Sequence, residues 1–136
     1  MHVELFALCD AATDQAGKLN ILGTFDTIHV QGFPAAHPSC AVAGRIRFEL
    51  SEQGSHEFKL SIIDQDGTSL VQPVNGKFPV KANPGAGTPT VNLVLNFQGL
   101  QIKQAGEYRI DLNVDNRVVA TLPLYVKLIT AGSFGR

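Results

Sequence analysis

The residues best suited to metal or nucleophilic chemistry are four histidines and two cysteines, spread thinly along the chain. His37 and Cys40 are two residues apart, a spacing that suits two ligands of one zinc ion, and His29 can join them if the intervening loop folds back. A structural zinc site usually takes four ligands in paired, short-spaced motifs, and the sequence offers one such pair. His29, His37 and Cys40 are therefore a candidate metal site, with ordinary loop and surface histidines as the alternative.

Asp64 and Asp66 form a second candidate, in the run Asp64-Gln65-Asp66-Gly67. Asp-Gly favours a tight turn, because glycine tolerates positive φ. An EF-hand calcium loop needs further oxygen ligands at fixed offsets and a closing glutamate, which this run lacks. We expect a turn, and a ligand site completed by another strand is the alternative.

The sequence shows no catalytic pattern. It contains no Gly-x-Ser-x-Gly elbow, and no glycine-rich phosphate loop opens a helix. We therefore expect a protein that is not an enzyme and needs no cofactor, although distant strands can assemble a site that sequence does not reveal.

Composition and charge exclude other classes. The net charge is −1, and 17% of the residues are charged. Nucleic-acid binding through phosphates needs clustered lysine and arginine, and an anionic membrane surface attracts basic segments. We expect neither nucleic acid nor membrane as a partner.

The length of 136 residues predicts one domain. We expect a single domain over residues 1–128 and a flexible tail over 129–136, whose end is rich in glycine and serine. Glu4 interrupts the first apolar run, and no basic segment precedes it, so we expect no signal peptide. Two cysteines without a secretion signal are typical of reduced thiols in a cytosol.

The least generic stretch of the chain is Gly17–Ile28. Leu19, Ile21, Gly23 and Phe25 share one parity, as in a half-buried strand, but the apolar positions then shift to Ile28 and Val30. The shift predicts a β-bulge or a break near Asp26. Gly23 falls on the inward parity, which predicts a close approach by another backbone or side chain.

Residues 42–50 have the clearest alternation in the chain. Their even positions are apolar or glycine, and the odd positions from 45 onward are Arg45, Arg47 and Glu49. This predicts one core face and one wet face. Together with Lys59, the two arginines form either exposed ion pairs with acids such as Glu49 and Glu57, or a basic recognition strip.

The preceding run, residues 31–39, has the composition of a Pro/Gly loop. Phe33 in this loop is interpreted as an anchor onto the core or as an exposed docking aromatic, with His37 nearby.

Other alternating runs complete the expected fold. Turn signals separate short strands at regular intervals, Asp115-Asn116 suits a two-residue hairpin turn, and Pro123 favours an edge position. The sequence predicts an all-β antiparallel sandwich of about eight strands. The remaining expected strands are residues 3–9, 58–62, 74–80, 91–97, 108–114 and 118–126.

Residues 104–110, Gln-Ala-Gly-Glu-Tyr-Arg-Ile, resemble the tyrosine corner of immunoglobulin-like sandwiches. Ile110 stands where those domains have their second core cysteine. The resemblance implies an immunoglobulin-like sandwich without a disulfide, which suits a reducing compartment.

The whole chain also resembles a bacterial family catalogued only as a domain of unknown function. That resemblance implies the fold class and assigns no activity. The matching runs are Leu8–Asp10, Gly17–Ile28, Phe33-Pro34, His37-Pro38, Asp64–Gly67, Gly106–Tyr108 and Leu122–Val126.

Two functions from different classes follow. The first is a non-enzymatic protein-binding or assembly module of a bacterial cytosol, with a protein partner or a second copy of the chain. Its candidate surface consists of Phe33, His37, Arg45, Arg47 and Lys59. The second is a small-ligand or metal site between loops, with or without an enzymatic activity, at the histidine–cysteine or aspartate candidates above.

Overall fold

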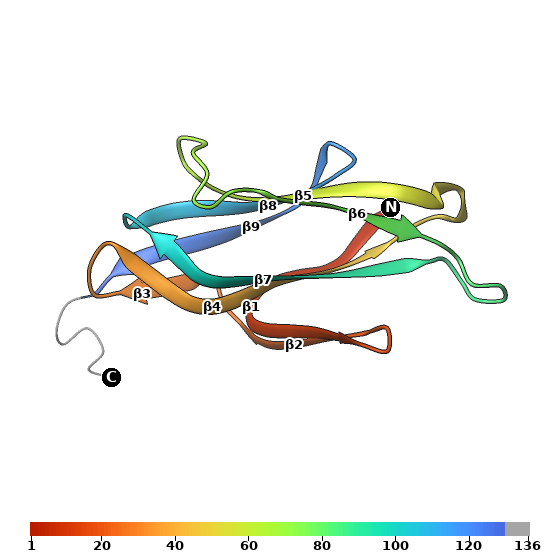
Figure 1. Ribbon diagram of the computed structural model, residues 1–136, viewed down its shortest axis with the longest axis horizontal. Helices are drawn as coiled ribbons and strands as arrows, with labels where there is room; N and C mark the ends of the chain where they lie inside the picture. Colours follow the sequence, from red (N-terminus) through yellow and green to blue (C-terminus); the bar gives the residue numbers. More distant parts are fainter. Residues whose placement is uncertain (130–136) are drawn as a thin grey trace.

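Two β-sheets pack face to face in the computed structural model, which describes residues 1–129 (Figure 1). Sheet A has the strand order β2-β1-β4-β7, and sheet B the order β3-β9-β8-β5-β6. Sheet A consists of β1 (His2–Gln15), β2 (Lys18–Thr24), β4 (Ala35–Arg47) and β7 (Thr90–Ile102). Sheet B consists of β3 (Thr27–Val30), β5 (Gly54–Asp64), β6 (Val74–Val80), β8 (Gly106–Val114) and β9 (Arg117–Leu128).

The structure confirms the all-β class and the two sheets. The described residues form nine strands rather than about eight, together with one short 3₁₀ helix, η1 (Leu50–Glu52). Neighbouring strands are antiparallel except β3 and β9, which are parallel. The immunoglobulin-like assignment stays a prediction.

The main core lies between the inner faces of the two sheets. Alternate residues of each strand supply it, as the period of a strand requires. On β8 of sheet B, Ile110, Leu112 and Val114 are buried. They belong to the same core cluster as Ile46 of β4 in sheet A and Phe48, which directly follows β4. The predicted inward parity of both segments is confirmed.

The predicted break near Asp26 is confirmed and has a clear cause. β2 belongs to sheet A and β3 to sheet B, so the chain crosses between the layers at Phe25-Asp26. The backbone oxygen of Asp26 accepts a hydrogen bond from the Tyr125 amide at 2.7 Å. The apolar residues on the two sides of this break pack in different places: Leu19 and Ile21 pack against the small cluster around Cys9 and Ala41, whereas Ile28 and Val30 join the main core.

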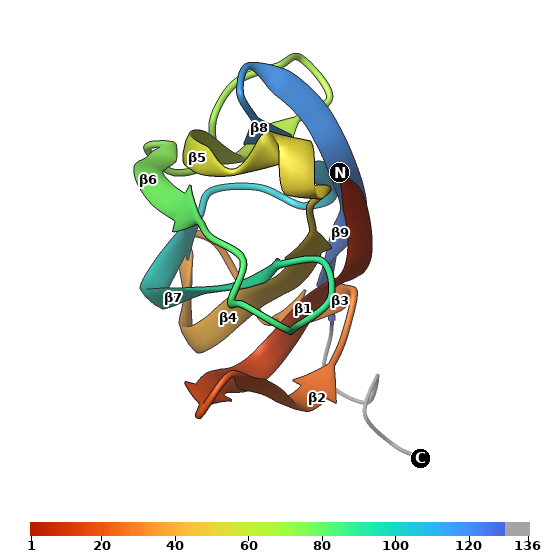
Figure 2. The same ribbon diagram turned by 90° about the vertical axis from the view of Figure 1, so that its right-hand side faces the viewer.

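The prediction of a fully wet face for residues 42–50 is wrong in part, because the β1–β2 hairpin covers some of that face. Cys9, Ala41 and Ala43 are 0% exposed, although they lie on the outer side of sheet A. Leu19 and Ile21 of β2 pack against them. In Figures 1 and 2 this hairpin lies on the side of sheet A that faces away from sheet B. The small alanine side chains allow the hairpin to approach the sheet closely.

Two strands are longer than expected. β1 continues beyond the expected strand 3–9 through residues 10–15, and the turn that follows is Ala16-Gly17, with φ of 53° and 78°. Residues 35–39 belong to β4 rather than to the predicted loop 31–39. Of the predicted tail, Ile129 donates its amide to the Val30 oxygen at 2.8 Å, and residues 130–136 lie outside the described residues.

Gly23 lies against the side chain of Asp10. A Cβ at Gly23 would sit 2.6 Å from Asp10 Oδ2, and the φ of Gly23 is +72°. The predicted close approach is therefore an internal contact, which joins the Leu8–Asp10 and Gly17–Ile28 runs.

Gly23→Ala is expected to lower the free energy of unfolding by about 1–2 kcal/mol, because a side chain disfavours positive φ. Chemical denaturation measures the change, and Gly32→Ala is the control, since its φ is not positive and nothing lies within 4 Å of its Cβ position. If the cost disappears in an Asp10→Ala background, the contact rather than the backbone angle is its origin.

Candidate functional site

The histidine–cysteine candidates are not brought together. Cys40 faces the main core, where burial raises the pKa of its thiol to about 11. His37 is half-buried, with its ring centroid 5.7 Å from that of Phe25, and His29 is exposed on β3. Over residues 1–129, no three His, Cys, Asp or Glu side chains are grouped as metal ligands.

The two cysteines are free thiols on opposite faces of sheet A. Cys9 donates to the Ala41 oxygen at 3.4 Å on the outer side, while Cys40 points inward. The sandwich therefore forms without a disulfide between them.

The Asp64–Gly67 run forms the predicted turn. Asp64 Oδ1 accepts the amides of Asp66 and Thr68, each at 2.9 Å, and the Asp64 carbonyl accepts the Gly67 amide at 3.1 Å. The Asp64 carboxylate is thus occupied in holding the turn.

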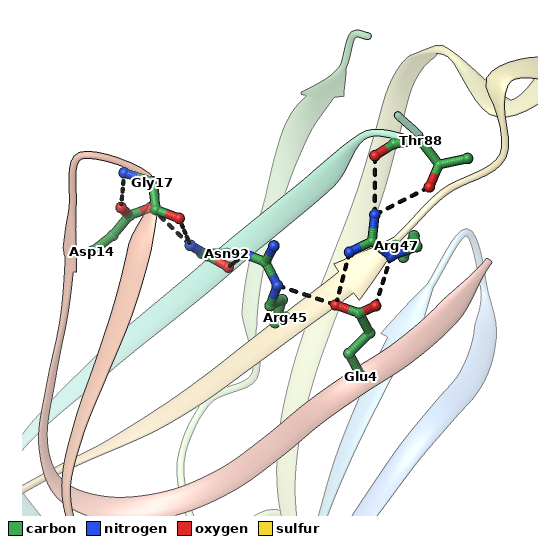
Figure 3. Close-up of polar contacts among 7 residues, drawn as sticks. All are labelled: Glu4, Asp14, Gly17, Arg45, Arg47, Thr88 and Asn92. Atoms are coloured by element: carbon green, nitrogen blue, oxygen red, sulfur yellow. Dashed lines mark hydrogen bonds and ion pairs between the residues drawn. The ribbon is translucent and has the colours of Figure 1, made fainter. Parts of the chain in front are cut away.

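Arg45 and Arg47 meet on one carboxylate, that of Glu4 (Figure 3). Arg45 Nε lies 3.1 Å from Glu4 Oε1, and Arg47 Nε lies 2.6 Å from Glu4 Oε2. The hydrogen bond from Arg47 is the main cause that lowers the pKa of Glu4, and Arg45 acts in the same direction. The acid that pairs with both arginines comes from β1, whereas Glu49 and Glu57 were the expected partners.

The remaining donors of these arginines hold neighbouring strands. Arg45 Nη1 donates to Asn92 Oδ1 on β7 at 3.1 Å, and Asn92 Nδ2 donates to the Gly17 oxygen at 3.2 Å. Arg47 Nη1 donates to the backbone and side-chain oxygens of Thr88 at 3.1 Å. These contacts, visible in Figure 3, tie β1, β4, β7 and the hairpin turn together.

The prediction that Arg45, Arg47 and Lys59 lie on one basic strip is wrong. Arg45 and Arg47 lie on the outer side of sheet A, whereas Lys59 is exposed on β5 in sheet B. Phe33 is half-buried and packs against the main core, as an anchor does. These residues do not form one surface.

A groove lies on the outer side of sheet B, over β5, β8 and β9. Its volume is about 410 Å³. Ile63 and Pro123 give it apolar walls, while Glu107, Arg109 and Thr121 supply polar groups. It is lined by Ile63, Asp64, Gln65, Gly67, Glu107, Tyr108, Arg109, Thr121 and Pro123.

Asp111 positions the arginine of this groove. Arg109 Nε donates to both Asp111 carboxylate oxygens at 3.0 Å, and Thr121 Oγ1 donates to Asp111 Oδ1 at 3.0 Å. Asp111 is 8% exposed, whereas the Arg109 side chain is 58% exposed. Among the described residues, the hydrogen bonds of Arg109 use Nε alone, which leaves its two terminal nitrogens available to another group.

This arrangement suits recognition of a carboxylate. A guanidinium offers paired donors that match two carboxylate oxygens, and holding it in place reduces the entropy lost on binding. The sequence reasoning above missed Arg109, Asp111 and Thr121. The available signal was that Arg109 and Asp111 take the outward parity of a strand whose other parity is apolar.

Tyr108 is a buried neighbour of Arg109 on β8 and belongs to the main core. Its hydroxyl donates to the Gln104 backbone oxygen at 2.7 Å, and burial raises the pKa of the phenol. This is the hydrogen bond of a tyrosine corner, so the local geometry suggested by residues 104–110 is present.

The fold and the groove define a two-sheet β-sandwich protein with a positioned arginine on one outer face. The chain belongs to a family of unknown function, DUF6941, whose sequence profile matches residues 4–127. This confirms the family resemblance given by the central stretch. No curated protein matches the chain.

Solved structures with similar regions are much larger proteins. A β-glucosidase from Listeria innocua, in complex with isofagomine, is 11% identical, with a TM-score of 0.49; the match covers 95% of this chain and 17% of the enzyme. The alkylpurine DNA glycosylase AlkC of Pseudomonas fluorescens, bound to DNA containing an abasic site analog, is 6% identical with a TM-score of 0.43, covering 74% and 27%. A β-glucuronidase from glycoside hydrolase family 2 is 18% identical with a TM-score of 0.37, covering 71% and 11%.

This chain therefore spans less than a third of each of these proteins. The comparisons establish no enzymatic role for it. Within residues 1–129, no helix has the length and hydropathy needed to cross a bilayer.

Proposed function

We propose that this protein is a non-enzymatic protein-binding module of a bacterial cytosol, and that it docks an acidic segment of a partner in the groove beside Arg109. The observation that carries the proposal is the exposed guanidinium held by the buried Asp111. Arginine with free terminal donors beside apolar walls is a frequent anchor of protein interfaces.

The chemistry of the groove favours binding over catalysis. Its lining carries the carboxylates of Asp64 and Glu107 beside Arg109 and Thr121. Asp64 Oδ1 accepts the turn amides, and Glu107 accepts a hydrogen bond from Gln65 Nε2 at 3.2 Å. The histidine and cysteine candidates lie elsewhere, as described above. Arg109 is the cationic side chain among the groove's lining residues, and it is the group to which we assign the partner's carboxylate.

Arg109→Ala is expected to weaken partner capture at least about 30-fold, the typical effect of losing an interface arginine worth 2 kcal/mol. The measurement is quantitative mass spectrometry of proteins that co-purify with the tagged chain from its native host. Lys59→Ala is the matched control, because Lys59 is an exposed cation on the same side of sheet B outside the groove. Arg109→Lys, which keeps the charge and loses the paired donors, should retain part of the capture.

Retention of every partner by Arg109→Ala would exclude the groove as the docking site. Because Arg109→Ala leaves the buried Asp111 without its cation, a thermal melt must first show that the variant is folded. Native mass spectrometry of untagged protein from the host tests the small-ligand alternative: a discrete excess mass lost in Arg109→Lys would indicate a small anion in place of a protein.

A further inference from the structure

β7 is an edge strand of sheet A with an unusual composition. Its thirteen residues include neither a charged residue nor a proline. Natural edge strands are usually protected by charge, by proline or by shortness. The other edges follow that rule: β6 carries Lys77 and Pro79, β2 begins with Lys18, and β3 has four residues.

The hydrogen-bond pattern shows which backbone groups of β7 are free. Phe48 donates its amide to the Pro89 oxygen at 2.9 Å, directly before β7 pairs with β4. Hydrogen-bonded pairs alternate along an antiparallel ladder, so the odd residues Val91, Leu93 and Leu95 bond to β4. The amides and carbonyls of Asn92, Val94 and Asn96 therefore point to the open edge, where no strand of residues 1–129 pairs.

The sequence of this edge is close to a chemical palindrome centred on Val94. Two copies in antiparallel register place Val94 opposite Val94, Leu93 opposite Leu95, and Asn92 opposite Asn96. Val91 then faces Phe97, and Thr90 faces Gln98. Every apolar residue meets an apolar one, every polar residue meets a polar one, and no like charges are opposed.

We propose that two copies of this chain pair through β7 around a two-fold axis at Val94, joining their four-stranded sheets into one continuous sheet. The three residues whose backbone groups point to the open edge, Asn92, Val94 and Asn96, form about six backbone hydrogen bonds across the axis. Val91, Leu95 and Phe97, which are half-buried at the open edge of the core, gain cover from the partner's equivalents. A second copy is the occupant because the edge complements itself, as an isologous interface requires. The proposal concerns sheet A and does not depend on the groove of sheet B.

Sedimentation velocity over a concentration series tests the dimer. The mass is expected to rise from 14.6 kDa towards twice that value. Asn96→Pro is expected to raise the dimer dissociation constant at least about tenfold, or 1.4 kcal/mol. Proline removes an amide that bonds only across the axis, and its ring obstructs the edge. Asn96→Thr, which keeps the amide, should dimerise like the parent chain.

Val94→Lys provides a second test that uses no proline. It places two lysines opposite each other at the axis, so dimerisation should fall at low salt and recover partly at high salt. Because Val94 also packs against the cluster of Cys9, Ala41 and Ala43, a thermal melt must first show that the variant is folded. A chain that stays monomeric at all concentrations, or a dimer that survives both Asn96→Pro and Val94→Lys, would overturn the proposal. Arg109→Ala should leave the dimer unchanged, so failure of the groove and failure of the edge are separate results.

Discussion

Phe48→Ala is expected to lower the free energy of unfolding by about 3–5 kcal/mol, the range for removing a buried aromatic side chain. Phe48 is 1% exposed. Its ring centroid lies 5.0 Å from that of His56 and 5.8 Å from that of Phe78. Truncation leaves a cavity beside both rings, which a tightly packed sandwich fills only in part. Because small domains are stable by only about 5–15 kcal/mol, the variant will be close to unfolding at room temperature.

Urea denaturation monitored by circular dichroism measures this change. Leu50→Ala is the control, because Leu50 is two residues away and 56% exposed, so its effect should stay within about 0.5 kcal/mol. Phe48→Leu keeps most of the apolar volume and should fall between the two. If Phe48→Ala and Leu50→Ala cost the same, Phe48 does not hold this end of the core.

The core position of Phe48 follows from the sequence alone. The alternation of residues 42–50 predicts its direction, and residues 108–114 predict the facing side in the same way. The Asp115-Asn116 turn was also predictable, and both residues have positive φ, 50° and 66°. The edge position predicted from Pro123 holds only locally: β9 lies between β3 and β8, but its pairs with β3 begin at Tyr125, beyond Pro123. Each of these signals is local, and the strand period translates it directly into structure.

The hairpin over sheet A was not predicted, because its signal is not local. In the sequence, Ala41 and Ala43 occupy the less apolar face of an alternating strand. Only the folded structure, in which β1 pairs with β4, shows that the β1–β2 hairpin covers them. A continuous apolar run such as Ala41-Val42-Ala43 is typical of a strand covered on both faces. That interpretation would have identified the cover without saying which segment supplies it.

The groove was missed for a related reason. Ile63, Arg109 and Thr121 come from three strands, and the registers of β5, β8 and β9 bring them side by side. The pairing of Asp111 with Thr121 depends on a hairpin register that shifts between Leu112 and Asn113. A register shift of this kind is a property of the folded sheet, so the strand pattern of the sequence does not place these side chains together.

His56 is expected to make stability depend on pH. His56 Nδ1 lies 2.5 Å from Asp115 Oδ2, and His56 Nε2 lies 2.6 Å from the Glu52 backbone oxygen. Both partners are acceptors, and only the charged imidazolium donates from both ring nitrogens, so the two contacts favour the charged form of His56. The hydrogen bond to the Glu52 backbone oxygen is the main cause that raises the pKa of His56, and the hydrogen bond to Asp115 acts in the same direction. The ring lies beside those of Phe48 and Phe78, and its side chain is 15% exposed.

The direction of the pH effect follows from these shifts. The pKa of His56 is raised, so its contribution is complete below the unfolded value of about 6.5 and is lost as pH rises through the folded value. Asp115 behaves in the opposite sense. The Glu57 amide at 3.0 Å, and then His56, lower the pKa of Asp115, so its contribution is lost only as pH falls below about 3.9. The Glu52 carboxylate also faces His56 and favours the charged ring.

His56→Gln is therefore expected to cost about 1–3 kcal/mol near pH 6, the range for hydrogen bonds to a charged group. The cost should shrink as the pH rises through the folded-state pKa of His56, because the parent chain then loses the imidazolium while the variant has none to lose. Urea denaturation of both proteins across this range gives the two slopes, and His29→Gln, at an exposed histidine, is the control. Parallel slopes for the parent chain and His56→Gln would contradict an imidazolium in the folded state. A steeper fall in the parent chain alone would place the proton on His56, between Asp115 and the end of η1.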